Sequence, residues 1–111
     1  MTHRSELMKG NIDSLLLCLL GRQPTYGYKL IEELSGRSDG YFQFKEGTLY
    51  PALHRLEGVN LIRGEWQTLP GGRQRRYYYL TEKGRHALTE KRGQWQEFLA
   101  AMNLIIQPTS D

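Results

Sequence analysis

Four segments of this 111-residue chain carry apolar residues at the three- and four-residue spacing of a helix. The first is clear from Asn11 to Gly21, with an earlier start near Ser5 as an alternative, and apolar residues fill most of its circumference, which predicts a helix buried nearly all round. The second runs from Thr25, a suitable N-cap, to Gly36, a suitable stop. Gly27 lies in its first turn, and because glycine is unfavourable in a helix we expect another backbone to pass close by.

The third segment, at residues 48–58, divides into an apolar face and a polar face. Thr48 is a candidate N-cap, which would place Pro51 in the first turn, where its missing N–H costs little. The apolar face consists of Leu49, Ala52, Leu53 and Leu56, and the polar face of Tyr50, Pro51, His54, Arg55 and Gly58. A phenol, an imidazole and a guanidinium along one ridge can read base edges and bind phosphate.

Residues 61–80 change from helical spacing to the alternation of strands. Leu61–Thr68 and Gln74–Leu80 each have a strand-like pattern, and Leu69–Arg73 between them contains a Pro-Gly-Gly turn signal. These residues predict a β-hairpin with an arginine at its tip. Because it follows the second of two short helices, the hairpin is expected to be the wing of a winged helix-turn-helix.

The hairpin also holds the net charge of the chain. Four arginines stand there against one glutamate, which gives +3, and +3 is the formal charge of the whole sequence. A basic excess concentrated in one segment indicates a nucleic-acid surface. The alternative is a solvated charged loop with no binding role.

The fourth segment predicts a long C-terminal helix over residues 82–106, capped by Thr81 and followed by Pro108. Its apolar residues form a seam longer than so small a core can cover, which favours a homodimer contact in the manner of a coiled coil. The expected interface residues are Leu88, Trp95, Phe98, Leu99, Met102, Ile105 and Ile106. Gly93 interrupts the seam at a cost of about 1 kcal/mol relative to alanine.

Composition excludes several classes of protein. Hydrophobic residues make up 39% and charged residues 24% of the chain, as in a soluble globular domain. The longest apolar run, Leu15–Leu20, is too short to span a bilayer, and no signal peptide is recognisable, so we expect a cytoplasmic protein that does not bind membranes. Cys18 is single, and His3, His54 and His86 are far apart. We therefore expect that the protein has no metal site, no cofactor and no catalytic residues, and that it is not an enzyme.

Two blocks of sequence, found in this order, are specific enough to indicate a protein family. They are Gly47–Glu57 (GTLYPALHRLE) and Arg73–Gly84 (RQRRYYYLTEKG), and Tyr26–Leu30 (YGYKL) precedes them. Together they resemble the PadR family of bacterial transcriptional regulators over most of residues 12–88. The single C-terminal helix resembles the smaller subfamily of that family. Asn60 stands where the family often has glycine, and the carboxylate of Glu46 lies near the expected DNA face.

The resemblance implies a homodimeric winged helix-turn-helix repressor whose affinity for DNA falls when a small molecule binds. It maps family DNA contacts onto Tyr28, Thr48, Tyr50, Pro51, His54, Arg73, Arg75 and Arg76. Lys29 and Arg55, neighbours of these residues on polar faces, are added as candidate phosphate contacts. Tyr28 and Lys29 are equally compatible with ordinary surface. Because alternate residues of a strand face opposite sides, Arg75 is preferred to Arg76 as a phosphate contact.

The resulting prediction is an α+β, mostly α-helical fold. Residues 1–80 form a winged helix-turn-helix, with the recognition helix at about 48–58 and the wing at about 61–80, and residues 81–107 form a dimerisation helix of the same compact unit. The predicted function is a ligand-responsive repressor that binds a palindromic operator as a homodimer. The alternatives are a winged-helix module for protein–protein interaction, or a metal-sensing regulator, which the lone Cys18 and dispersed histidines disfavour.

The effector is expected to be planar and aromatic, or otherwise hydrophobic. Trp95 lies mid-way along the seam, and two copies related by a two-fold axis would flank a flat slot, with Phe98 and Leu99 beside it. The alternative is that Trp95 is only a large residue in the core of the dimer.

Overall fold

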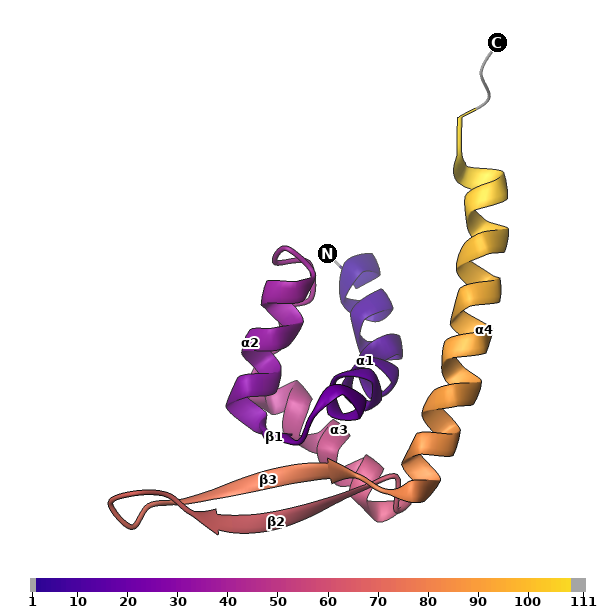
Figure 1. Ribbon diagram of the computed structural model, residues 1–111. Helices are drawn as coiled ribbons and strands as arrows, with labels where there is room; N and C mark the ends of the chain where they lie inside the picture. Colours follow the sequence, from indigo (N-terminus) through magenta and orange to yellow (C-terminus); the bar gives the residue numbers. More distant parts are fainter. Residues whose placement is uncertain (1, 109–111) are drawn as a thin grey trace.

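The computed structural model describes residues 2–108, and the side chains of residues 11–108. Figure 1 shows a helical body, a two-stranded arm that extends from its base, and a long helix that rises on the other side. In chain order the elements are α1 (Thr2–Arg22), β1 (Thr25–Tyr26), α2 (Gly27–Arg37), α3 (Glu46–Gly58), β2 (Ile62–Thr68), β3 (Gln74–Leu80) and α4 (Glu82–Ile106). The predicted α+β, mostly helical class is confirmed.

The core lies where α1, α2, α3 and the base of the sheet meet. Its fully covered side chains include Leu16 and Leu17 of α1, Leu30 of α2 and Leu53 of α3. The prediction that α1 is buried nearly all round is wrong, because Leu15, Cys18 and Leu19 are only partly covered. The open side of α1 faces α4, which runs beside it without closing over it (Figure 1).

The beginning of α2 differs from the prediction. Thr25 is not a helix cap: with Tyr26 it forms β1, which pairs with Tyr77 and Tyr78 of β3. Pairing with β3 thus overrides the local preference of Thr25 for a helix end. The neighbour of Gly27 is also not a backbone, because a Cβ built there would lie 2.6 Å from Cζ of the Tyr50 ring. The helix runs past Gly36 to Arg37.

The third helix begins two residues earlier than predicted. The N-cap position of α3 is Lys45, which makes no side-chain capping bond, so Thr48 is the third helical residue and Pro51 the sixth. Pro51 therefore lies inside the helix, where it lacks the N–H that would donate to the carbonyl of Gly47. The predicted apolar face is confirmed: Leu49, Ala52, Leu53 and Leu56 are all buried.

The end of α3 and the hairpin agree with the sequence prediction. Asn60 takes the left-handed conformation, with φ of 63°, that turns the chain from α3 into β2. The strands β2 and β3 pair antiparallel from Ile62 with Leu80 to Thr68 with Gln74. The tip turns at Gly71 and Gly72, which have φ of 94° and 90°. With β1 on the outer edge of β3, the sheet has the order β1-β3-β2.

Helix α4 is capped as predicted, since Thr81 Oγ1 accepts a 3.0 Å hydrogen bond from the N–H of Gly84. It continues through Gly93 to Ile106 without a break. Leu88, expected on the dimer seam, is instead 5% exposed and belongs to the core of the chain itself. Farther along, the helix stands clear of the body (Figure 1), and within residues 2–108 no helix is long and apolar enough to cross a membrane.

Candidate nucleic-acid interface

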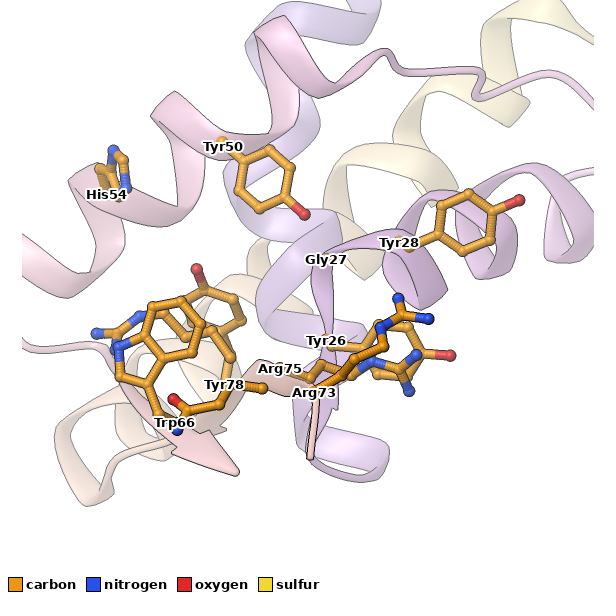
Figure 2. A pocket seen from close by; sticks show the side chains of 11 residues that line it. Tyr26, Gly27, Tyr28, Tyr50, His54, Trp66, Arg73, Arg75 and Tyr78 are labelled. Carbon is orange, nitrogen blue, oxygen red and sulfur yellow. The ribbon is translucent and has the colours of Figure 1, made fainter. Parts of the chain in front are cut away.

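A groove of about 750 Å³ lies between the start of α2, the polar face of α3 and the hairpin (Figure 2). It brings together six residues that the sequence prediction assigned to DNA contact: Tyr28, Tyr50, His54, Arg73, Arg75 and Arg76. Three segments far apart in sequence thus meet at one concave surface. Thr48 and Pro51 lie on the same helix as Tyr50 but do not line the groove.

Tyr50 lies across the groove rather than pointing straight out of it. Its ring extends from α3 toward Gly27, at the first position of α2, where only a hydrogen leaves room for it (Figure 2). Burial, and next the nearby charge of Glu46, raise the pKa of Tyr50. Like an ordinary tyrosine, the phenol is neutral at physiological pH and can both donate and accept a hydrogen bond.

His54 lies one helical turn beyond Tyr50 and is exposed at the rim. Tyr28 stands at the opposite side of the groove, with 62% of its surface exposed. Both side chains are free to turn toward a ligand, because neither is packed into the core. The polar ridge predicted for α3 thus reaches solvent at His54, while at Tyr50 it is half-buried.

Two of the expected cations form ion pairs on the protein surface. Arg55 Nη2 lies 2.9 Å from Asp13 Oδ1 of α1, and Lys29 Nζ lies 3.8 Å from Glu32 and 4.0 Å from Glu33. Apart from Glu33, at 24%, these side chains are 40–58% exposed, and such pairs contribute about 0–1 kcal/mol, so a phosphate can displace the carboxylate. Neither residue lines the groove.

Arg75 is held by aromatic rings. Its guanidinium carbon lies 3.8 Å from the centre of the Tyr26 ring, and Tyr26 packs edge-to-face on Tyr77 at 5.5 Å. Stacking on a ring fixes the plane of a guanidinium while leaving its N–H groups free at the edge. Arg73, at the exposed tip, and Arg75 have no carboxylate within ion-pair distance among the described side chains.

The other two arginines of the hairpin have acidic partners. Arg63 pairs with Glu65 on the outer face and also lies 4.5 Å from the centre of the Tyr79 ring. Arg76 Nη2 lies 2.8 Å from Glu57 Oε2 of α3. The positive charge that remains uncompensated on the hairpin therefore belongs to Arg73 and Arg75.

Sequence reasoning missed two aromatic residues of this surface. Tyr26 supports Arg75, and Trp66 of β2 lines the groove with 64% of its surface exposed. Alternation placed Trp66 on the parity of the buried Ile62, but it could not reveal that the core ends between them. The available signal was a tryptophan near the outer end of a mostly polar strand.

A second, mainly apolar groove of about 490 Å³ lies between α1 and α4. Trp95 and Leu99 of α4 face Leu15, Cys18 and Phe42 across it. Phe98, the third residue expected at an effector site, packs edge-to-face on Trp95 at 5.6 Å but lines a neighbouring hollow instead.

Metal-ligating side chains do not gather in the described part of the chain. Among the described residues, no three histidine, cysteine, aspartate or glutamate side chains lie close enough to hold a metal ion.

The arrangement of a helical body, α3 and a basic hairpin recurs in known proteins. The family described as the transcriptional regulator PadR-like family matches residues 16–90, which include α3 and the whole wing. The chain belongs to this family. Membership supports a DNA-binding regulator, and it confirms both the resemblance seen in the sequence and the winged-helix class of the fold.

Relatives and solved structures agree with the family. "Uncharacterized protein X" of Lysinibacillus sphaericus is 34% identical over 104 residues, which cover 94% of this chain and 95% of that protein. Transcriptional regulator Rv3488 of Mycobacterium tuberculosis is 44% identical over 72 residues, or 65% of this chain and 64% of that protein. The family and Rv3488 are both described as transcriptional regulators.

Two crystal structures resemble the fold over nearly their whole length. A PadR family transcription regulator from hypervirulent Clostridium difficile R20291 matches with a TM-score of 0.78 and 34% identity, over 87% of this chain and 99% of that one. The PadR-like regulator BC4206 of Bacillus cereus matches with a TM-score of 0.82 and 29% identity, over 94% and 99%.

Proposed function

We propose that this PadR-like chain is a repressor that binds a palindromic operator as a homodimer and responds to a hydrophobic small molecule. The observation that carries operator binding is the groove between the polar face of α3 and the wing, at which Arg73 and Arg75 have no acidic partner among the described side chains. A DNA strand supplies the negative charge that this surface lacks.

In this proposal α3 enters the major groove. His54 and Tyr50 lie at or near the base edges, and Thr48 and Pro51, in the first half of the helix, approach the backbone. Arg73 and Arg75 contact phosphates beside the minor groove, while Tyr28, Lys29 and Arg55 contact the phosphates that border the helix. Base contacts would supply specificity, and phosphate contacts would supply most of the affinity.

The proposed dimer forms along α4. Phe98, Leu99, Met102, Ile105 and Ile106 are all large apolar residues that the chain leaves exposed. Burying them against a second copy removes this surface from water and relates two α3 helices by a two-fold axis. A palindromic operator with half-sites about one helical turn apart, roughly 34 Å, matches that symmetry.

The proposed effector binds in the groove between α1 and α4, beside Trp95. A planar aromatic or other hydrophobic molecule suits its apolar lining. If Trp95 is only a core residue of the dimer, aromatic ligands will neither quench tryptophan fluorescence nor weaken operator binding. Parallel measurements on Trp95→Phe identify which tryptophan reports the ligand.

An electrophoretic mobility shift with the DNA upstream of the gene tests operator binding. A discrete shifted band that an excess of unrelated duplex does not remove supports the proposal. Footprinting should then show two symmetric half-sites. A band that unrelated DNA removes equally well, or the absence of any band, would instead favour the interaction module as the function of this surface.

A further inference from the structure

Arg76 occupies a different environment from its neighbours on the wing. Its side chain lies on the inner face of β3, between the groove and the body, and is 31% exposed. Nη2 lies 2.8 Å from the carboxylate of Glu57, which is itself 23% exposed. The guanidinium carbon also lies 5.5 Å from the centre of the Trp66 ring and 5.8 Å from that of Tyr78. One side chain thus contacts α3, β2 and β3.

The opposite strand leaves space for this guanidinium at Gly64. A Cβ built at Gly64 would lie 2.6 Å from Nε, Cζ and Nη2 of Arg76. In the register of the hairpin Gly64 pairs with Tyr78, and Trp66 pairs with Arg76. The side chain therefore lies in a notch between Gly64 and Trp66, which directs it toward α3 rather than outward to solvent.

The ion pair also compensates an unfavourable position of Glu57. Glu57 is the penultimate residue of α3, where the negative end of the helix dipole disfavours a carboxylate. Arg76 supplies the opposite charge at that point. Two residues 19 positions apart thus join the end of α3 to β3 of the wing.

The geometry of the wing makes this junction mechanically important. The buried residues Ile62, Tyr78 and Leu80 hold only the base of the hairpin. From the Ile62–Leu80 pair to the Thr68–Gln74 pair, the last before the tip, is six residue steps, or about 20 Å at roughly 3.3 Å per residue. A tilt of about 10° at the base would move the tip by about 3.5 Å, more than the length of a hydrogen bond.

We propose that Arg76 is a positioning residue, which ties the wing to α3 through Glu57 and so sets the distance between Arg73 and the recognition helix, instead of contacting phosphate. The inference rests on the proposed function, because the distance matters only if α3 and the wing bind one DNA duplex. It assigns Arg76 to positioning the wing and Arg75 to contacting phosphate, although they are adjacent in sequence.

The substitution Glu57→Gln changes the affinity for DNA in opposite directions for the two possible roles of Arg76. If Arg76 binds phosphate, removing the carboxylate frees the guanidinium and removes repulsion of DNA, so binding becomes tighter. If Arg76 positions the wing, the same change loosens the hairpin and binding becomes weaker. Glu65→Gln is the matched control, because Glu65 has the same charge but pairs with Arg63 on the outer face.

The experiment measures affinity by fluorescence anisotropy on a duplex selected from a random library, over a range of salt concentrations. We expect Glu57→Gln and Arg76→Gln each to weaken binding about three- to tenfold, and the double variant to be no weaker than either, as for coupled residues. The slope of log affinity against log salt should stay at the wild-type value, because no phosphate contact is lost. Glu65→Gln should not weaken binding, and circular dichroism confirms that each variant is folded.

Tighter binding by Glu57→Gln, or a flatter salt slope for Arg76→Gln, would overturn the proposal. If the wild-type chain selects no duplex, the proposed function fails. The link between α3 and the wing through Glu57 and Arg76 is then tested by measurements on the protein without DNA. In a Trp95→Phe background, Glu57→Gln should lower the fluorescence anisotropy of Trp66, and Glu57 and Arg76 should be coupled in urea unfolding. If neither effect is seen, Arg76 does not hold the wing to α3 through Glu57.

Discussion

At the scale of single residues, Gly27 and Tyr50 illustrate what a sequence can and cannot predict. The unusual glycine in a first helical turn led us to expect a neighbouring backbone, and that expectation is wrong. The neighbour is the Tyr50 ring, because the packing of α2 on α3 brings the two together across the groove. Helical periodicity placed Tyr50 on the polar face, but only the tertiary structure determines that it is half-buried.

Gly27→Ala should lower the free energy of unfolding by about 1–3 kcal/mol, because the new methyl group overlaps the Tyr50 ring. In a Tyr50→Ala background the same substitution should be neutral or stabilise by up to about 1 kcal/mol, because alanine loses less backbone entropy on folding. Urea denaturation followed by circular dichroism measures both. Gly36→Ala is the control within α2, since a Cβ there meets nothing within 4 Å. Equal losses in the two backgrounds would contradict the overlap.

At the scale of elements, hydrophobic periodicity located every helix and the hairpin, because the buried faces of α3 and β3 follow the periods of 3.6 and 2. Starting points were less predictable. Thr25 and Thr48 both have the chemistry of a cap, but Thr25 pairs with β3 and Thr48 lies within α3. Likewise, strand alternation places Arg75 and Arg76 on opposite faces but does not reveal their partners; Arg75 stacks on Tyr26 and Arg76 pairs with Glu57.

The wing provides a prediction about electrostatics. Arg73→Ala and Arg75→Ala should each weaken operator binding and lower the steepness of its salt dependence by about 0.9 per lost phosphate contact, or about twice that for a dimer. Filter binding or anisotropy at several salt concentrations measures the slope. Arg37→Ala, which removes an equal charge at the far end of α2, should leave the slope unchanged. If neither wing variant changes the slope, Arg73 and Arg75 do not contact phosphate.

At the scale of the whole molecule, the chain is long and uneven. It extends over 64 × 30 × 22 Å, because α4 projects beyond the body that its first turns help to build (Figure 1). Sequence alone predicted the projecting seam from its apolar pattern. It assigned Leu88 to the seam as well, since a repeat of seven residues cannot reveal where the core of one chain ends and an outer surface begins.

The exposed seam predicts that oligomeric state and affinity for the operator change together. Met102→Asp should convert the proposed dimer into a monomer, because a charge replaces an apolar side chain that a second copy would cover. Affinity for a palindromic operator should fall about a hundredfold or more, since two linked half-site contacts become independent. Sedimentation measures the mass, and anisotropy measures binding to the whole operator and to one half-site.

Leu104→Asp is the matched control for the dimer. Leu104 is more exposed than Met102, at 84% against 40%, but it projects about 180° away from Trp95 around the helix. If general loss of hydrophobic surface caused dissociation, Leu104→Asp would have the larger effect. If a specific seam holds the dimer, Leu104→Asp stays dimeric while Met102→Asp does not. A wild-type chain that sediments as a monomer at every concentration, yet binds the palindrome tightly, would exclude α4 as the dimer contact.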